Sequence, residues 1–238
     1  MSYADNHRFS IVIPFYNEEG NVVPVIRETK EALPGVEIVA VNDGSTDSTY
    51  LELLKFPDIK VVSFPENRGQ GVALYEGIYA ASNEHCVLMD GDGQFDPRDA
   101  ALLAFELFNA HLVIGVRAHR KDTGHTIFFS KIANAVRRII LGDSVTDTGS
   151  MKAVRRNSAL EHLFPFEGIH RYIPSFFAAV GLSIREIPIS HRPRHSGKTK
   201  YSHTSRALRG ICHLIFVRSA IKTTQKKAAA RIASRLVS

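Results

Sequence analysis

Short apolar runs alternate with longer segments of helical periodicity along the first half of the chain. Each run has the length and composition of a buried strand and ends in polar or turn-forming residues. The expected strands are 9–14, 36–41, 59–64, 86–89 and 112–116, with a late strand at 182–189. Strands that alternate with helices in this way predict a doubly wound, mostly parallel α/β sheet.

Prolines and capping residues set the expected element boundaries. Pro14 is expected to stop the first strand, because proline cannot donate to a sheet ladder. Asn21 is expected to cap the following helix, with Pro24 tolerated in the first turn and the last residue near Leu33. Pro97 is expected to open a later helix.

The pattern is less regular after residue 117. We expect an amphipathic helix over 127–141, a turn-rich segment over 147–152 and an aromatic-rich helix over 168–181. A basic, glycine-containing loop follows over 191–201. The domains expected are a catalytic domain over 1–205 and a basic amphipathic helical tail over 206–238.

The strand 86–89 runs directly into Asp90 and Asp92, which are separated by Gly91. Open α/β sheets bind ligands at the carboxyl ends of their strands. Two hard oxygen donors at this place suit Mg²⁺ or Mn²⁺, with a diphosphate as another ligand. Ordinary turn chemistry is the alternative. A calcium loop is rejected, because Gln94 and Phe95 stand where that loop needs an acidic residue and a glycine.

Charge is unevenly distributed along the chain. The net charge is +6, yet residues 187–238 hold twelve of the thirty Lys and Arg and no acidic residue. Such a basic segment favours an anionic partner, which could be a membrane, a nucleic acid or a phosphorylated substrate. Two cysteines form no disulfide framework, and no apolar run is long enough to span a bilayer. A cytoplasmic protein is therefore expected, soluble or peripheral to the membrane.

Five motifs in order give the chain a family resemblance over roughly residues 8–202. They are Val12-Ile13-Pro14-Phe15-Tyr16-Asn17-Glu18-Glu19, Asn42-Asp43-Gly44-Ser45-Thr46-Asp47, Asn67-Arg68-Gly69-Gln70-Gly71, Asp90-Gly91-Asp92-Gly93-Gln94 and Arg194-His195-Ser196-Gly197-Lys198-Thr199-Lys200-Tyr201. Together they resemble the family 2 glycosyltransferases, and most closely the polyprenyl-phosphate group that includes dolichyl-phosphate mannose synthase. A dinucleotide-binding enzyme is disfavoured, because the first strand is followed by polar and acidic residues rather than glycines.

The resemblance implies a GT-A fold and roles at matching positions. The nucleotide-sugar pocket would comprise Pro14, Tyr16, Glu18, Val41, Asp43, Asp90, Gly91, Asp92 and Gln94. Asp92, Asp90 and Gln94 would hold Mg²⁺ or Mn²⁺ and the diphosphate. The catalytic residues implied are Asp92, Arg117, Arg194 and Lys200, and the acceptor phosphate would meet Lys131, Arg194 and Lys200.

The implied reaction is inverting transfer of a sugar, as by a hexosyltransferase, from a GDP- or UDP-sugar to a polyprenyl phosphate. A phosphate monoester is largely dianionic at neutral pH, so this acceptor needs positioning and no general base. A hydroxyl acceptor on a glycan is the alternative, and it would need a carboxylate base, for which Asp147 is the one candidate. Nucleic-acid binding is disfavoured, because the tail has few aromatic residues for base stacking.

The tail 206–238 is expected to contact the membrane surface. One helical face would carry Leu208, Ile211, Cys212, Ile215 and Phe216, although Leu214 and Val217 break a clean stripe. An interfacial helix of this kind would hold the protein on the cytoplasmic face of the membrane. Packing of the apolar face on the catalytic domain is the alternative, and a membrane-spanning partner subunit could attach the protein instead.

Overall fold

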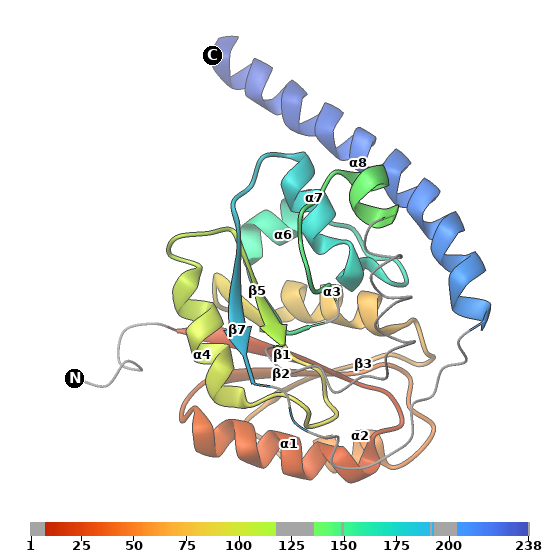
Figure 1. The fold of residues 1–238 in the computed structure, drawn as a ribbon. Coiled ribbons are helices and arrows are strands. Elements are labelled where there is room, and N and C mark those ends of the chain that lie inside the picture. The colour runs from red at the N-terminus through yellow and green to blue at the C-terminus, as the bar shows by residue number, and fades with distance from the viewer. Residues whose placement is uncertain (1–7, 118–135, 149, 191, 193–203, 238) are drawn as a thin grey trace.

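The computed structural model describes residues 8–117, 136–148, 150–190, 192 and 204–237. Its centre is a seven-stranded sheet in the order β3-β2-β1-β4-β6-β5-β7 (Figure 1). The strands are β1 (Phe9–Phe15), β2 (Glu37–Asn42), β3 (Lys60–Ser63), β4 (His85–Leu88), β5 (Leu112–Arg117), β6 (Lys152–Arg155) and β7 (Ile184–Ile189). Only β6 runs antiparallel to its neighbours, so the predicted mostly parallel sheet is confirmed.

Helices cover both faces of the sheet. The helices are α1 (Glu19–Ala32), α2 (Thr49–Leu53), α3 (Gln70–Ala80), α4 (Pro97–Glu106), α6 (Arg156–His162), α7 (Ile173–Ala179) and α8 (Thr204–Val237), with the 3₁₀ turn η1 (Ile169–Arg171). Figure 1 shows α1 and α2 below the sheet and α3, α6 and α7 above it. A further helical segment covers residues 136–141 at the end of the expected amphipathic helix.

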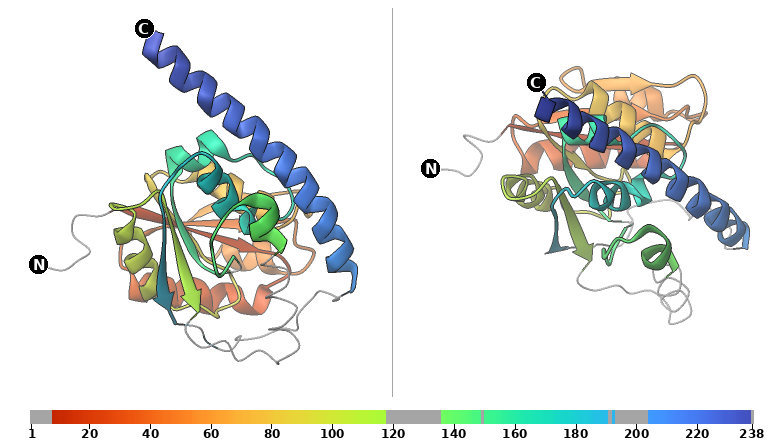
Figure 2. Two further views of the ribbon diagram at one scale, coloured as in Figure 1. Left: turned by 45° about the horizontal axis from the view of Figure 1, so that its top comes forward. Right: turned by 90° about the horizontal axis from the view of Figure 1, so that it is seen from above.

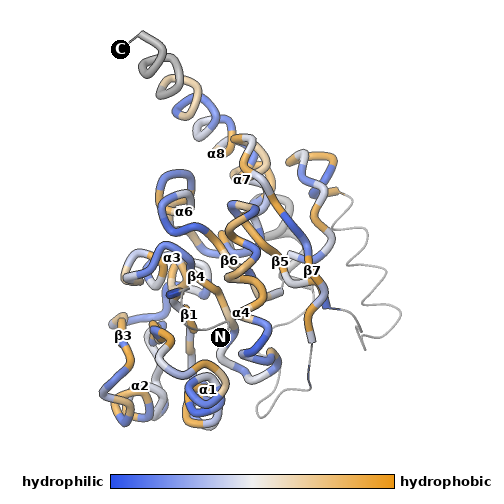
Figure 3. The backbone as a smooth tube through the Cα atoms, turned by 90° about the vertical axis from the view of Figure 1, so that its left-hand side faces the viewer, coloured by the Kyte–Doolittle hydropathy of each residue, from blue (hydrophilic) through white to orange (hydrophobic). Residues whose placement is uncertain are grey.

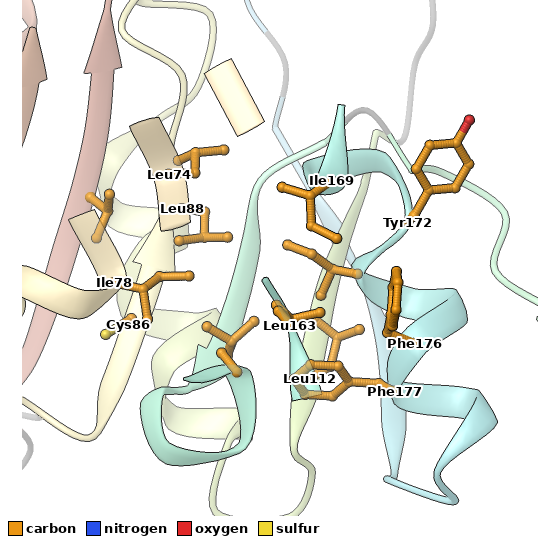
Figure 4. Close-up of a cluster of buried hydrophobic side chains, with 14 of the residues drawn as sticks. Leu74, Ile78, Cys86, Leu88, Leu112, Leu163, Ile169, Tyr172, Phe176 and Phe177 are labelled. Carbon is orange, nitrogen blue, oxygen red and sulfur yellow. The ribbon is translucent and has the colours of Figure 1, made fainter. Parts of the chain in front are cut away.

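Alternate residues of the central strands belong to two separate hydrophobic clusters, one on each face of the sheet. Ile11 and Ile13 pack with α1, α2 and α4, whereas Val12 packs with α3 on the other face. The second cluster extends to α7, where Phe176 and Phe177 are fully buried (Figure 4). Figure 3 shows hydrophobic residues along β5 and β6. This alternation has the period of two that a strand imposes on side-chain direction.

The prediction that Pro14 stops the first strand is wrong, because β1 continues to Phe15. The carbonyl of Val12 accepts a hydrogen bond from the Met89 N–H, so this edge of β1 faces β4. Pro14 lies two residues further on and faces the same way. Since β4 ends at Leu88, no strand beside Pro14 requires the N–H that proline lacks.

The predicted start of the first helix is also wrong. The helix begins at Glu19, and Glu18, not Asn21, is the N-cap residue. The Asn21 side chain instead donates to the Glu18 carboxylate from within the first turn. Pro24 therefore lies inside the helix, although the predicted end near Leu33 is confirmed.

The structure contains a strand that the hydrophobic pattern does not predict. The turn-rich segment ends at Met151, and β6 follows over four residues with a basic residue at each end. Because Lys152 and Arg155 flank only two apolar residues, the strand has no apolar run to identify it. The helix expected over 168–181 is divided into η1 and α7, and Gly168 before η1 has a φ of +84°.

Helix α8 lies along α7, and its C-terminal part extends beyond the rest of the molecule (Figure 2). Its side chains are described over 213–230, where Leu214, Val217 and Ile221 are buried in the cluster with α7. Ile215 is exposed and Phe216 is half-exposed, with its ring edge-on to Phe166, so the packing face differs from the predicted stripe and contains the residues that interrupt it. Among the described residues, no helix combines the length and hydropathy that crossing a bilayer requires.

A matched pair of substitutions tests this orientation of α8. Ile221 is 6% exposed and Ile215 is 68% exposed, so the same change should have different effects at the two positions. We expect Ile221→Ala to lower the free energy of unfolding by about 2–4 kcal/mol through loss of buried methyl groups. Ile215→Ala should change it by less than about 0.5 kcal/mol. Urea titrations of the two variants decide, and equal losses would contradict the orientation.

Candidate functional site

The carboxyl ends of β1, β2, β4 and β5 lie at one edge of the sheet, because these strands run in one direction. The antiparallel β6 begins at this same edge. The topology thereby gathers Tyr16, Asp43, Asp90 and Arg117, which the sequence predicts as site residues, and adds Lys152. Pro14 and Val41 are register partners within β1 and β2, and both are buried.

The loops after β1 and β2 are held together by reciprocal hydrogen bonds. Asn17 has a φ of +50°, and its N–H donates to Ser45 Oγ at 3.0 Å while its Oδ1 accepts from the Thr46 N–H at 2.7 Å. The Glu18 N–H donates to Thr49 Oγ1 at 2.8 Å. Asparagine tolerates left-handed backbone better than most residues, which suits this position. These bonds hold Asn17 and Glu18, and with them the preceding residue Tyr16, beside the loop that follows β2.

Asp43 is buried at the end of β2, with 2% of its surface exposed. Its Oδ1 accepts from the Arg68 N–H at 2.7 Å, and its Oδ2 accepts from Asn67 Nδ2 at 3.0 Å. Burial raises the pKa of this carboxyl, and the hydrogen bonds oppose the rise. At Gly44, with a φ of +65°, a Cβ atom would lie 2.1 Å from the carbonyl carbon of Glu66. The motif after β2 therefore requires glycine for close packing against the loop before α3.

Asp90 and Asp92 lie in the turn after β4. Gln70 Nε2 donates to Asp90 Oδ1 at 2.7 Å, and the Gln94 N–H donates to Asp92 Oδ1 at 3.1 Å. Burial and the negative charge of Asp92 raise the pKa of Asp90 to about 6. At Gly91 a Cβ atom would lie 2.7 Å from the Phe15 ring, so this turn packs directly on the end of β1.

The donor set of this turn suits a hard divalent cation. Among the described residues, no three His, Cys, Asp or Glu side chains come together as a metal cluster. Mg²⁺ is commonly held by one or two carboxylates, with water and substrate phosphates completing the coordination. Asp90 and Asp92 match that arrangement, and a bound cation would offset the repulsion between their charges.

Arg117, at the end of β5, forms a bidentate ion pair with Asp147. Its Nε donates to Asp147 Oδ2 at 2.7 Å and its Nη2 donates to Oδ1 at 2.9 Å. Both side chains are largely buried. Asp147, the carboxylate that the sequence offers as a general base, thus has both oxygens engaged by a guanidinium.

Two residues at this edge are absent from the sequence-predicted site. Lys152 begins β6 and donates from Nζ to the carbonyls of Thr148 and Ser150, each at 2.8 Å. Burial lowers the pKa of Lys152 to about 8. In the sequence, the only sign of Lys152 is its place directly after a turn-rich acidic segment. Arg192, the second of these residues, belongs to the basic loop, and its N–H donates to the Gln94 carbonyl at 2.8 Å.

Arg192 ties the chain after β7 to the carboxylate-bearing turn. Gln94 Nε2 donates to the Arg192 carbonyl at 3.4 Å. The Arg192 guanidinium pairs with Glu28 of α1 at 2.5 Å and with Asp96, the N-cap of α4. The basic loop therefore starts from a fixed point beside Gln94. Arg194, Lys200 and Lys131 lie outside the described residues.

The close approach at Gly91 generates a prediction. In Gly91→Ala the new methyl group would clash with the Phe15 ring and with the Pro14 carbonyl, which lies 2.8 Å from the Cβ position. We expect the free energy of unfolding to fall by about 1–3 kcal/mol. In a Phe15→Leu background the same change should cost less, because part of the ring is gone. Urea unfolding of the four proteins measures this coupling, and additive effects would contradict the packing.

The fold is similar to that of solved glycosyltransferase structures. Glucosyl-3-phosphoglycerate synthase from Mycobacterium tuberculosis, in complex with Mn²⁺, UDP and glucosyl-3-phosphoglycerate, matches with a TM-score of 0.68 at 22% identity. The match covers 91% of this chain and 81% of that chain. The same enzyme with UDP matches with a TM-score of 0.71 at 22% identity, over 92% and 82% of the chains. At this identity the likeness shows the fold, and the predicted GT-A architecture is confirmed.

Curated relatives extend the comparison to sequence. Dodecaprenyl-phosphate galacturonate synthase from Rhizobium johnstonii is 32% identical over 225 residues, which cover 87% of this chain and 65% of the relative. Undecaprenyl-phosphate 4-deoxy-4-formamido-L-arabinose transferase from Pseudomonas fluorescens is 30% identical over 207 residues, 82% of this chain and 61% of the relative. The chain thus spans less than two thirds of the length of these relatives.

A family model gives the most direct assignment. The model described as glycosyl transferase family 2 matches residues 10–164, a range that contains the loops after β1, β2 and β4 and the Arg117–Asp147 pair. The matched range is well over half of the chain. The chain therefore belongs to glycosyl transferase family 2.

Proposed function

We propose that this chain is a metal-dependent, inverting glycosyltransferase that moves a sugar from a nucleoside-diphosphate sugar to a polyprenyl phosphate. The observation that carries the proposal is the pair of carboxylates after β4, Asp90 and Asp92, at the same edge of the sheet as the buried Asp43 at the end of β2. The two curated relatives, whose names specify dodecaprenyl phosphate and undecaprenyl phosphate, support the acceptor class. The catalytic unit is proposed to be residues 1–205.

The donor nucleotide is proposed to bind at the ends of β1 and β2. Tyr16 and Glu18 lie on the loop that the hydrogen bonds of Asn17 hold against the β2 loop. Pro14 and Val41 shape this edge from within the sheet. Asp43, held by two donors from the loop before α3, presents a fixed acidic group toward the base or ribose. UDP is the first nucleotide to test, because the structural neighbour was solved with it.

The diphosphate is proposed to bind beside Asp90, Asp92 and Gln94. Mg²⁺ or Mn²⁺ held there would neutralise negative charge that develops on the leaving diphosphate. The chain's own part is to hold the two carboxylates in a turn that Gln70 and the Gln94 N–H fix. Arg194 and Lys200 of the basic loop are proposed to add charge-assisted contacts to the phosphates.

The acceptor is proposed to be a phosphate and not a hydroxyl group. A hydroxyl nucleophile needs a general base, whereas a phosphate monoester already carries its negative charge at neutral pH. Both oxygens of Asp147 accept from Arg117, so the one candidate base is committed to an ion pair. Arg117 lies at the end of β5, where it can orient anionic groups, and Lys131, Arg194 and Lys200 are proposed to hold the acceptor phosphate.

The transferred sugar is proposed to be either a hexose derivative or a pentose derivative. One relative is named for galacturonate and another for 4-deoxy-4-formamido-L-arabinose, so a restriction to hexoses has no support. The structural neighbour solved with Mn²⁺ is a glucosyl-3-phosphoglycerate synthase, so its acceptor belongs to a different class.

A transfer assay tests the proposed function and the role of Asp92 together. Purified protein is incubated with Mn²⁺, an undecaprenyl phosphate and a panel of UDP- and GDP-sugars. The products are identified from their masses by mass spectrometry. We expect one sugar-phosphate-lipid product, and we expect Asp92→Asn to reduce its rate by about 10²-fold or more through loss of a metal ligand.

Asp58→Asn is the control, because this carboxylate is exposed and forms a surface ion pair with Lys30. It should retain wild-type turnover. If Asp92→Asn also retains metal-dependent turnover, the assignment of Asp92 is wrong. If the wild-type protein transfers only to hydroxyl acceptors, the polyprenyl-phosphate proposal is wrong.

Helix α8 is proposed to bring the protein to the cytoplasmic face of the membrane, where such an acceptor lies. The exposed residues of α8 include Ile215, Arg218, Lys222 and Lys226. Apolar and basic residues together are typical of helices that lie in the headgroup region of an anionic bilayer. A membrane-spanning partner subunit is the alternative attachment.

Liposome co-sedimentation tests the membrane proposal. We expect the protein to bind vesicles containing anionic lipid and to be released as salt rises, because exposed charges are screened beyond about 8–10 Å. Each basic residue near the surface is worth about 1 kcal/mol, so Lys222→Gln with Lys226→Gln should weaken binding about tenfold or more. The control is Lys55→Gln with Arg98→Gln, two exposed basic residues, one in the turn after α2 and one on α4. Equal effects of both pairs, or no binding at low salt, would contradict a role for α8.

A further inference from the structure

Lys152 is a buried cation at the candidate site that the proposed reaction does not use. Only 4% of its surface is exposed, although the side chain ends in an ammonium group. Burying a charge costs free energy unless partners compensate it, so such residues are rare without a reason. We propose that Lys152 is a positioning residue that balances Asp90, limits the affinity of the carboxylate pair for a divalent cation, and holds the loop that carries Asp147. This inference rests on the proposed metal-dependent function.

The antiparallel direction of β6 accounts for the position of Lys152. The strand lies between β4 and β5, with Lys152 in register with Leu88 of β4 and Ile114 of β5. Leu88 is the last residue of β4, and Asp90 follows two residues later. A parallel strand in this place would present its last residue to the site, whereas β6 presents its first. Lys152 is thereby inserted between the carboxylate turn and the end of β5.

The surroundings of the ammonium group have both signs of charge. Asp90 and Asp147 attract it, whereas Arg117 and Arg171 repel it. Lys152 in turn favours the charged form of Asp90, whose pKa burial and Asp92 raise. Lys152 and Arg117 both oppose the charge of Asp90, and Arg117 is already paired with Asp147.

Two hydrogen bonds to backbone carbonyls give Lys152 a second role, which is to hold the loop that carries Asp147. Its Nζ donates to the carbonyls of Thr148 and Ser150, which stand one and three residues after Asp147 in the chain. The loop is thus held by Lys152 and by the Arg117–Asp147 pair. One ammonium group therefore supports the loop that carries Asp147 and also opposes the charge of Asp90.

A consequence for metal binding follows from these charges. Without Lys152, Asp90 and Asp92 would face a cation with their full negative charge and would hold it more tightly. A tightly held cation would also retain the diphosphate product, because the diphosphate supplies the remaining ligands. Lys152 should therefore lower metal affinity in the free protein and raise turnover. A lysine that only supported the loop would have no such effect on metal affinity.

The test is Mn²⁺ binding to the purified, substrate-free protein, measured by electron paramagnetic resonance of the unbound ion. Three proteins are compared, which are the wild type, Lys152→Met and Lys152→Arg. We expect Lys152→Met to bind Mn²⁺ about tenfold more tightly, equivalent to ~1.4 kcal/mol, and Lys152→Arg to stay near the wild type. In the transfer assay kcat should fall for Lys152→Met and recover for Lys152→Arg.

The outcomes separate this inference from the proposed function. A wild-type protein that binds no Mn²⁺ and shows no metal-dependent transfer overturns the metal site itself. A wild-type protein that binds Mn²⁺, with unchanged or weaker binding in folded Lys152→Met, overturns the balancing role of Lys152 alone.

A stability cycle keeps the test decisive if Lys152→Met folds poorly. Each of Asp90→Asn and Lys152→Met leaves one charge uncompensated, whereas the double variant removes both. We expect the double variant to be more stable than the sum of the single effects predicts, and to fold even if Lys152→Met does not. Additive losses in urea titrations, or a double variant that fails to fold as well, would overturn the pairing of Lys152 with Asp90.

Discussion

Two carboxylates share one buried turn, and their mutual repulsion is the constraint on which the rest of the site depends. Burial and the neighbouring Asp92 raise the pKa of Asp90 to about 6, so ionised Asp90 needs compensation from its surroundings. Gln70 at the start of α3 donates to it, and the cations Lys152 and Arg117 oppose its charge. These partners come from α3, β6 and β5, so the strand order itself is part of the electrostatic arrangement.

Close backbone approach provides the second requirement of the site. At Gly44 a side chain would collide with the backbone of Glu66, and at Gly91 it would collide with Phe15. The turn after β2 therefore packs closely on the loop before α3, and the turn after β4 packs closely on the end of β1. The backbone that carries the acidic side chains is held in place by this packing. Asn17 holds the loop after β1 against the loop after β2 through hydrogen bonds to Ser45 and Thr46. The loops at these three strand ends are thus each held by packing or by hydrogen bonds.

The sequence was sufficient to predict the elements that carry a strong hydrophobic period. Strands such as β1 and β4 have apolar runs, and the acidic residues that follow them identify the edge where a ligand would bind. Lys152 and Arg192 could not be predicted in the same way, since their importance depends on partners far along the chain. Lys152 comes near enough to Asp90 to oppose its charge only because β6 is inserted antiparallel, and Arg192 pairs with Glu28 across 164 residues. No local period in the sequence records either interaction.

The Arg117–Asp147 pair bears on the kind of nucleophile that this site can use. A carboxylate that accepts two hydrogen bonds from a guanidinium is stabilised in its charged form and is a poor proton acceptor. Lys152 also holds the backbone of the loop that carries Asp147, through the carbonyls of Thr148 and Ser150. A hydroxyl group would have to lose its proton here without help. An acceptor that arrives with its own negative charge meets no such obstacle, and Arg117 lies at this edge of the sheet, at the end of β5.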